Sequence, residues 1–400
     1  MRLAPRRCAL TASLLLASSL GAAPPQNYFV GLLGKTPAEV DAKVQAAYRA
    51  YFLAPDAGNS QRLYYPAGAD EATIWAGKAS GSVHRVITEG QSYGMMIAVQ
   101  LDQRDVFDKL WRWTKDHIQY KSGPRKGYTC WNALSSGRCG SGQGDENPAT
   151  DGEEYFATAL LFASQRWGNQ GAFDYEADAQ SLLDLMRLGP GSRGAEITPM
   201  FDAATFLPVF TPIGKAAVFT LPAYNIPGFF EVWSRRAKQG GAFWAQAAAR
   251  SRAFHSASFH PVTGLSPYMA TFAGAPHREG PDFNDDSCRA IMNVAVDQAW
   301  FGKNPEASQL ADRLLAFFHK EGVKSFKQEY TLKGRPKVQW QSTSTVAMAA
   351  TGAMVSTLPY RKEFVQRLWD EPLPQGQYRY FNGMLYMLAT LHLSGKFQPY

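Results

Sequence analysis

Segments with helical spacing of apolar residues follow one another through almost the whole chain, and this rhythm most constrains its fold. Thr36-Pro37-Ala38-Glu39 forms a capping box with proline at the first helical position, before Val40, Val44 and Ala47. Only residues 324–332 and 336–340 suggest a β-hairpin. Eleven further helices are expected over 92–101, 105–118, 152–167, 175–188, 227–236, 241–255, 286–301, 305–320, 343–355, 361–369 and 381–393.

Short loops join several of these helices into antiparallel pairs, so two architectures are possible. A helical solenoid would show a sequence period of about 34 to 45 residues. The chain has no such period, so we expect an all-α fold in which the helices close into a toroid, with one small β-hairpin excursion.

The composition excludes disorder and gives little support to a polyanionic partner. The 400 residues include 10 Trp, 18 Tyr and 24 Phe, whereas disordered chains are poor in aromatic residues. The formal charge of +7 falls to +4 without residues 1–23, which hold three arginines and no acid. The rest contains no run of Lys or Arg, so we expect no nucleic-acid partner.

The N-terminus has the pattern of a secretory signal peptide. Arg2, Arg6 and Arg7 precede a short apolar stretch over 8–20, and Gly21-Ala22-Ala23 offers a cleavage site. That stretch is too short to span a membrane, and no later segment is long and apolar enough. We therefore predict a signal peptide over 1–23 and a secreted or periplasmic protein without a membrane partner. We expect residues 24–400 to form a single domain and the protein to be a monomer.

Export would permit a disulfide between Cys130 and Cys139, nine positions apart around a loop-like stretch; the alternative is two buried thiols. Cys288 would remain unpaired. The chain has no HExxH, no CxxC, no His/Asp cluster with metal spacing, no glycine-rich phosphate loop and no GxSxG. We therefore expect neither a metal nor a cofactor.

Carboxylates stand at the entrances of three expected helices. Glu89 lies between glycines, Asp151 precedes Gly152, and Asp285-Asp286 comes one turn before Arg289. Helix capping and the helix dipole would explain each of them. In a toroid, however, helix N-termini can meet at one cleft, and glycoside hydrolysis needs two carboxyl groups beside aromatic walls. Aromatic residues near these positions are Trp131, Tyr128, Tyr155, Tyr224 and Phe283.

In their order and spacing, five segments resemble family 8 glycoside hydrolases, inverting enzymes on an (α/α)6 barrel. They are residues 88–95 (TEGQSYGM), 111–115 (WRWTK), 149–154 (ATDGEE), 286–289 (DSCR) and 378–383 (YRYFNG). The resemblance implies that Glu89 is the general acid and Asp286 the general base. It implies substrate contacts for Asp151, which would hold the sugar distorted, for Trp131, which would stack on it, and for the residues Arg289, Tyr224 and Tyr380.

Further stretches resemble the branch that releases xylose from reducing ends and its xylanase relatives: 200–202, 207–210, 227–233 and 260–267. The expected substrate is therefore β-1,4-xylan or its oligosaccharides. Two departures stand out. Leu221-Pro222-Ala223 replaces Asp-Pro-Ser before Tyr224, and residues 340–345 lack the histidine of the exo-acting branch, so internal cleavage stays open. The alternatives are an endo-β-1,4-glucanase, a non-catalytic sugar-binding protein and a polysaccharide lyase, although no cluster of lyase type is present.

Overall fold

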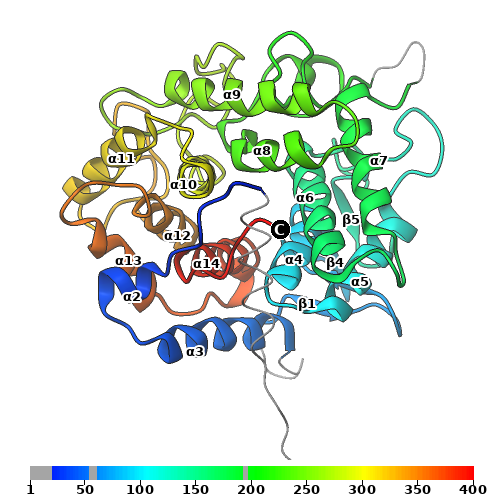
Figure 1. Ribbon diagram of the computed structural model, residues 1–400, viewed down its shortest axis with the longest axis horizontal. Helices are drawn as coiled ribbons and strands as arrows, with labels where there is room; N and C mark the ends of the chain where they lie inside the picture. The colour runs from blue at the N-terminus through cyan, green and yellow to red at the C-terminus, as the bar shows by residue number, and fades with distance from the viewer. Residues whose placement is uncertain (1–19, 54–60, 192–196) are drawn as a thin grey trace, which may run out of the picture.

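The computed structural model describes residues 20–53, 61–191 and 197–400. Two concentric rings of helices make up the molecule (Figure 1). Each inner helix contacts the next, and the last contacts the first, which closes the toroid that the sequence predicted. The inner ring consists of α4 (Thr88–Gln100), α6 (Thr150–Trp167), α8 (Pro227–Arg236), α10 (Arg289–Phe301), α12 (Thr343–Gly352) and α14 (Arg379–Leu393).

Outer helices alternate with inner ones along the chain, as an (α/α)6 barrel requires. A short helix, α2 (Tyr28–Leu33), precedes the first outer helix and packs against the last; the sequence pattern did not predict it. The outer ring consists of α3 (Pro37–Tyr48), α5 (Arg104–Trp113), α7 (Tyr175–Leu188), α9 (Gly241–Ser258), α11 (Ala307–Glu321) and α13 (Arg361–Asp370).

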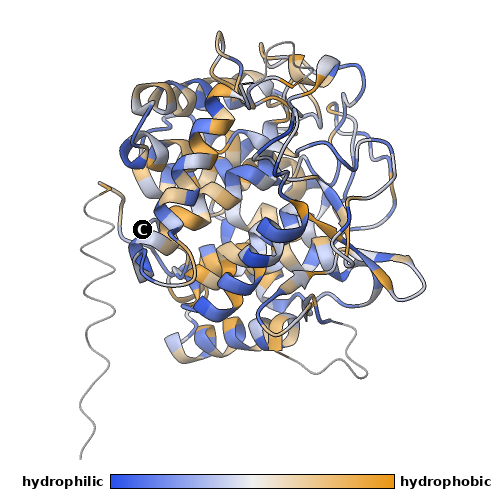
Figure 2. Ribbon diagram, turned by 90° about the vertical axis from the view of Figure 1, so that its right-hand side faces the viewer, coloured by the Kyte–Doolittle hydropathy of each residue, from blue (hydrophilic) through white to orange (hydrophobic). Residues whose placement is uncertain are grey.

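The two rings differ in how much of each helix is buried. Every residue of α4 is buried except Glu89, which is half-buried, whereas α5 buries only five of its ten residues. Burial on all sides disfavours charged side chains, and α4 carries only one, Glu89. In Figure 2, hydrophobic and hydrophilic residues alternate along the visible helices.

Two small antiparallel sheets lie beside the helices, and the sequence pattern had predicted neither. β1 (Tyr64–Pro66) pairs with β2 (Ala72–Ile74). In the other sheet, β4 (Val83–Ile87) pairs with both β3 (Gly77–Ser80) and β5 (Asn132–Leu134). β4 runs directly into α4, so this sheet leads the chain to the N-terminus of an inner helix.

The hairpin expected over 324–332 and 336–340 forms no regular strands. The segment does fold back on itself, through a single antiparallel bridge between Tyr330 and Pro336. Its polar side chains and Gly334, at positive φ, favour a turn over a ladder. Single-turn elements complete the described part: η1 (Arg49–Leu53), η2 (Thr114–Ile118), η3 (Gly214–Val218), η4 (Pro222–Tyr224) and η5 (Gly376–Tyr378).

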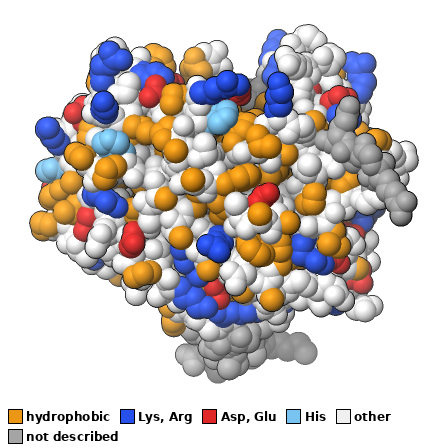
Figure 3. All heavy atoms as spheres, turned by 90° about the horizontal axis from the view of Figure 1, so that it is seen from above, with side chains coloured by type: hydrophobic (Ala, Val, Ile, Leu, Met, Phe, Trp, Pro, Cys, Tyr) orange, Lys and Arg blue, Asp and Glu red, His pale blue; other side chains and the backbone are white. Residues whose placement is uncertain are grey.

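Several predicted helix ends agree with the structure. The Thr36–Glu39 capping box forms in both directions, and Gly168 ends α6 at φ 73°. Residues 1–19 of the predicted signal peptide lie outside the described residues. None of the described helices has the length and apolarity needed to cross a membrane. On the face drawn in Figure 3, Lys and Arg side chains lie scattered among apolar and acidic ones.

Candidate active site

The N-termini of the inner helices bring the predicted site residues together. Because each inner helix is followed by an outer one that returns the chain, all six inner helices begin at the same end of the barrel. Glu89 is the second residue of α4, Asp151 the second of α6, and Arg289 the first of α10. Tyr224 closes η4 just before α8, and Tyr380 is the second residue of α14.

The guanidinium group of Arg289 connects two of the carboxylates. Its Nη1 donates to Oδ2 of Asp151 at 2.5 Å and to the hydroxyl of Tyr93 at 2.7 Å, and its Nη2 donates to Oδ1 of Asp286 at 2.7 Å. Asp151 is fully buried, whereas the side chain of Asp286 is 32% exposed. Arg289 therefore holds both carboxylates in place, and Asp286 is the more exposed of the two.

Glu89 has different surroundings. Its Oε1 accepts a hydrogen bond from the indole nitrogen of Trp131 at 3.1 Å, and its Oε2 accepts one from the Thr88 hydroxyl at 3.1 Å. Burial, followed by the nearby charge of Asp151, raises the pKa of Glu89 to about 8, although Arg289 and Trp131 oppose the shift. Glu89 thus holds a proton at neutral pH and can donate it.

Asp151 is an interior group whose charge Arg289 balances. Burial raises the pKa of Asp151 above the usual value, and the ion pair with Arg289 offsets only part of this rise. Helix capping was one explanation that the sequence offered for Asp151. This prediction was wrong: α6 begins at Thr150 without a side-chain cap, and the carboxyl oxygens of Glu154 are buried without a hydrogen-bond partner.

The general-base position was ambiguous in the sequence between Asp285 and Asp286. Only Asp286 pairs with Arg289, at the Asp-x-x-Arg spacing, while Asp285 accepts a hydrogen bond from the backbone nitrogen of Asp286. Neither residue caps α10, because that helix begins at Arg289, after a turn. The geometry therefore favours Asp286 as the reactive carboxylate.

A hollow of about 260 Å³ lies over these groups. It brings together Glu89, Asp286, Trp131 and Tyr224, although the segment before Tyr224 departs from the family pattern. The Tyr224 ring also lies under the Arg289 guanidinium, 5.8 Å from centroid to carbon. The remaining lining residues are Gln143, Gly144, Asn147, Pro148, Ala149, Phe210, Thr211 and Tyr268.

Phe210 and Tyr268 were not predicted as site residues. The backbone nitrogen of Tyr268 donates to Asp282 across a long loop, and Phe210 stacks near Tyr224 at 6.2 Å. Both come from irregular segments, so no periodicity could have indicated them, and the resemblance of residues 207–210 to the xylose-releasing branch assigned no role to Phe210. Their place in the wall of the hollow depends on contacts between distant parts of the chain.

Tyr380 contacts the same helix as Glu89 but lines a second hollow, of about 600 Å³, together with Asp285. A Cβ atom on Gly90 would lie 2.8 Å from the Tyr380 ring. Only glycine at this position lets the first turns of α4 and α14 approach so closely.

Trp131 is positioned by the chain around a disulfide. Cys130 and Cys139 are joined, as one of the two sequence interpretations had it, and Cys288 is a free, buried thiol. The backbone oxygen of Trp131 accepts a hydrogen bond from the nitrogen of Thr88 at 3.0 Å. The loop that carries the indole is thereby attached to the first residue of α4.

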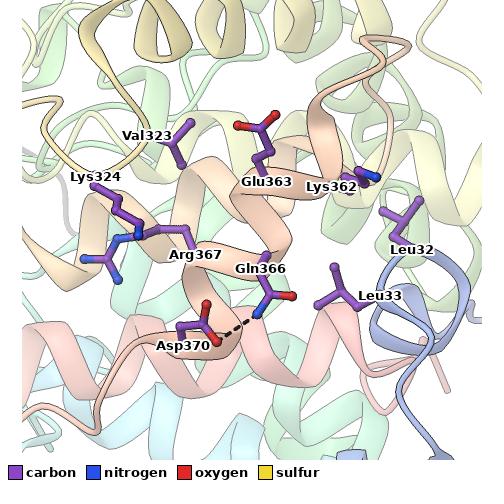
Figure 4. Close-up of a pocket in the computed structure, with 9 residues that line it drawn as sticks. All are labelled: Leu32, Leu33, Val323, Lys324, Lys362, Glu363, Gln366, Arg367 and Asp370. Atoms are coloured by element: carbon purple, nitrogen blue, oxygen red, sulfur yellow. Dashed lines mark hydrogen bonds between the residues drawn. The ribbon is translucent and has the colours of Figure 1, made fainter.

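Two other features of the described residues do not belong to this site. No group of three or more His, Cys, Asp or Glu side chains there could hold a metal ion. A hollow of about 700 Å³ between α2 and α13 is drawn in Figure 4; it is lined by Leu32, Leu33 and several Lys, Arg and acidic side chains. It contains no aromatic side chain and none of the carboxylates at the inner-helix N-termini.

Comparisons with known proteins agree with this geometry. The model of the family "Glycosyl hydrolases family 8" matches residues 78–395. The reducing-end xylose-releasing exo-oligoxylanase Rex8A of Paenibacillus barcinonensis is 36% identical over 373 residues, which cover 90% of this chain and 93% of Rex8A. Its solved complex with xylose superposes with a TM-score of 0.86 and covers 94% of this chain and 97% of the other.

Two further relatives extend the range of substrates. A GH8 xylanase of Teredinibacter turnerae, solved as a catalytic mutant with xylohexaose, is 35% identical with a TM-score of 0.86, over 96% of this chain and 99% of that one. Endoglucanase A of Acetivibrio thermocellus is 27% identical over 317 residues, which cover 78% of this chain and 62% of the relative.

Proposed function

We propose that this chain, which belongs to glycosyl hydrolase family 8, hydrolyses β-1,4 linkages in xylan or its oligosaccharides with inversion. Membership of the family makes it an O-glycosyl hydrolase of xylo-oligosaccharides or cellulose-type substrates. The proposed mechanism rests on one observation: the carboxyl groups of the site differ in whether a cation is their direct partner. Arg289 binds Asp151 and Asp286, while Glu89, outside this ion-pair network, has a pKa of about 8. An acid and a base beside one hollow are what inverting hydrolysis needs.

In the proposed reaction Glu89 donates its proton to the glycosidic oxygen, and the bond between that oxygen and the anomeric carbon breaks. A water on the opposite face of the sugar attacks the anomeric carbon and gives its proton to Asp286. Asp286 suits this role because it is the exposed partner of Arg289. The products are a free hydroxyl on the leaving sugar and an α-configured hemiacetal.

The remaining site residues would bind and shape the sugar. Trp131 and Tyr224 supply aromatic walls to the hollow, and Arg289 links Asp151 to Asp286, which lines it. We propose that Asp151 meets the sugar ring at the cleavage point and favours a distorted ring. Binding energy used for such distortion lowers the barrier of the chemical step.

Proton NMR of xylohexaose hydrolysis tests the stereochemistry. The α-anomer should appear first and the β-anomer should grow in afterwards by mutarotation. Initial release of the β-anomer would contradict the roles given to Glu89 and Asp286. Glu89→Gln and Asp286→Asn should each lower kcat by about 10²–10⁴-fold without a change in thermal stability large enough to unfold the protein.

The second candidate function is endo-β-1,4-glucan hydrolysis, favoured by the similarity to Endoglucanase A. Parallel digestion of xylohexaose and cellohexaose separates the two, since the carboxyl groups do not report on the hydroxymethyl group of glucose. We expect xylohexaose to be cleaved with the larger kcat/KM. Preferential cleavage of cellohexaose would replace the substrate but leave the catalytic roles intact.

We also propose that residues 1–23 are removed on export and that a single domain over 24–400 acts as a monomer in the periplasm or outside the cell. The arginines and apolar stretch of the N-terminus support this proposal. N-terminal sequencing of protein recovered outside the cytoplasm should begin close to Pro24. Size-exclusion chromatography with light scattering should give the mass of one chain.

A further inference from the structure

The first turn of α6 carries a second acidic side chain beside Asp151, and the proposed mechanism gives it no role. Glu153 lies two residues after Asp151 and is completely buried. Burying a carboxyl group is costly unless hydrogen bonds or charges compensate for the lost water. A buried acid so close to the reacting groups therefore calls for an explanation from its contacts.

Glu153 uses one carboxyl oxygen to hold a single residue of a neighbouring segment. Its Oε1 accepts a hydrogen bond from the backbone nitrogen of Thr129 at 2.7 Å and another from the Thr129 hydroxyl at 2.8 Å. Oε2, in contrast, is buried without a hydrogen-bond partner among the described residues. An oxygen of this kind accepts both bonds in the ionised carboxylate and also when the proton is on Oε2. The hold on Thr129 thus persists in either state.

Thr129 stands two residues before Trp131, and the bond from α6 is one of the anchors of this segment. The backbone nitrogen of Cys130 donates to the last residue of η2 at 3.1 Å, and that of Trp131 donates to the oxygen of Asn147 at 2.9 Å. The nitrogen of Thr129 donates to a side chain instead of a backbone oxygen. Glu153 therefore takes the place that a neighbouring strand would have at this point.

The same turn of α6 also contacts the residue before Glu89. The helices α4 and α6 are neighbours in the inner ring (Figure 1). A Cβ atom on Gly152 would lie 2.6 Å from the Thr88 hydroxyl oxygen, which donates to Oε2 of Glu89. Three successive residues thus serve the site: Asp151 through its ion pair, Gly152 by admitting Thr88, and Glu153 by holding the segment that leads to the indole.

We infer that Glu153 is a positioning residue for the general acid: by holding Thr129, it keeps the indole of Trp131 in hydrogen-bond contact with Glu89. This role rests on the proposed function, in which Glu89 is the acid. The indole hydrogen bond lowers the pKa of Glu89 against the effect of burial, so its loss should raise that pKa further. The pKa of Glu153 itself is raised to about 7 by burial, opposed by the bonds from Thr129.

Two substitutions of Glu153 separate the hydrogen bonds from the charge. Glu153→Met and Glu153→Gln both remove the charge and have similar length, but only glutamine keeps an oxygen that can accept from Thr129. In Glu153→Met, the falling limb of the pH profile of kcat/KM for xylohexaose should move upward by about half a pH unit or more. Its kcat should fall about tenfold. Glu153→Gln should restore the position of the limb and most of kcat.

Substitutions of Thr129 test the same contact from the other side, and they decide the question if Glu153→Met does not fold. Thr129→Val removes the hydroxyl and keeps the backbone donor, so it should move the limb in the same direction by a smaller amount. Thr129→Ser keeps the hydroxyl and should behave like wild type. The double variant Thr129→Val/Glu153→Met should shift no further than Glu153→Met alone, because both changes act through one contact.

The next residue of α6 provides the matched control. Glu154 is equally buried, but neither of its carboxyl oxygens has a hydrogen-bond partner among the described residues. Burial raises the pKa of Glu154 well above its usual value, so Glu154→Met removes no charge at neutral pH and should leave the limb in place. A shift as large as that of Glu153→Met would assign the effect to repacking of α6 and overturn the inference. So would an unmoved limb in Glu153→Met, or an equal shift in Glu153→Gln.

Crystal structures of the two Glu153 variants separate failure of this inference from failure of the proposed function. The indole nitrogen of Trp131 should lie beyond hydrogen-bond distance of Glu89 in Glu153→Met and within it in Glu153→Gln. An indole that keeps its place in Glu153→Met would overturn the positioning role even if activity falls. If the wild type cleaves neither xylohexaose nor cellohexaose, the proposed function falls, and the structures still decide whether Glu153 holds Trp131.

Discussion

At the scale of single residues, surroundings decide what each carboxyl group does. Glu89 and Asp286 line the same hollow, yet Arg289 pairs with Asp286 and leaves Glu89 to Trp131 and Thr88. Burial without a cation as direct partner raises the pKa of Glu89, whereas Asp286 is in direct contact with the Arg289 guanidinium. The division into acid and base therefore comes from the placement of a single guanidinium group.

The pH profile of kcat/KM should show that Glu89 acts as the acid. Because the pKa of Glu89 is raised to about 8, activity should persist through neutral pH and fall as Glu89 loses its proton above that value. In Trp131→Phe the falling limb should move to higher pH, since the indole hydrogen bond lowers the pKa of Glu89. A falling limb near pH 4.5 in the wild type would contradict the role of Glu89 as acid.

The raised pKa of Glu89 also makes the stability of the folded protein depend on pH. The pKa of Glu89 is higher in the folded protein than the ordinary value of 4.5, so ionising this group opposes folding. The opposition begins above pH 4.5 and grows until the pH passes about 8. Thermal melts should show that Glu89→Gln raises Tm relative to wild type at pH 9, and that this advantage disappears at pH 4. An advantage independent of pH would point to packing instead.

Removal of Arg289 should be costly. Arg289→Met leaves Asp151 buried without its ion-pair partner, which typically costs about 3–5 kcal/mol in the free energy of unfolding. Activity should be lost as well, because Asp286 loses the group that holds it. Urea melts measure the stability loss, and Arg278→Met, at an exposed arginine, is the control, expected within about 0.5 kcal/mol of wild type. Equal melts for the two variants would refute the structural role of Arg289.

At the scale of elements, helix starts and one small sheet position the site. The nitrogen of Thr88 donates to the Trp131 oxygen, directly after β4 and directly before β5, so sheet and helix share one anchor. The Cys130–Cys139 disulfide closes the loop around β5. This arrangement makes the indole of Trp131 a fixed neighbour of Glu89.

Loss of the disulfide should therefore affect both stability and chemistry. Cys130→Ser/Cys139→Ser should lower the free energy of unfolding by about 2–3 kcal/mol, since the bridge restricts the unfolded chain. It should also lower kcat, because the loop that holds Trp131 against Glu89 is loosened. Differential scanning calorimetry and kinetics with and without dithiothreitol provide the check. The reductant should affect the wild type and leave the serine variant unchanged.

At the scale of the whole molecule, the ring closes where α14 meets α4. Tyr380 packs on Gly90 at this seam, and Gly90 adjoins Glu89. Closure of the barrel and assembly of the site thus depend on the same contact between segments separated by almost three hundred residues. The seam couples global stability to catalysis.

Gly90→Ala tests this coupling. The added methyl group would lie 2.8 Å from the Tyr380 ring and must displace it, at a cost of about 1–3 kcal/mol. Both Tm and kcat/KM should fall. Gly31→Ala is the matched control in helix α2, where a Cβ meets nothing within 4 Å, and it should leave both values close to wild type. Wild-type kinetics for Gly90→Ala would show that the seam does not support the site.

Sequence reasoning succeeded where the information is local and failed where it is not. The spacing of apolar residues identified all twelve helices of the two rings, with ends displaced by a few residues: α4 begins at Thr88 rather than at 92. The strands were missed because each has only three to five residues and no clear alternation. Asp151 was interpreted as a cap because a sequence shows only its neighbours along the chain, whereas its partner Arg289 lies 138 positions away.

By itself, the sequence determined the helices, their alternation and the residue types at their entrances, because periodicity, capping and turn formation depend on neighbouring residues. Only the tertiary structure showed why Glu89 keeps a proton and that Tyr268 and Phe210 line the hollow beside it. These properties depend on how close residues from distant segments lie, how deeply they are buried and which charges they face. Closure of the ring brings those segments together.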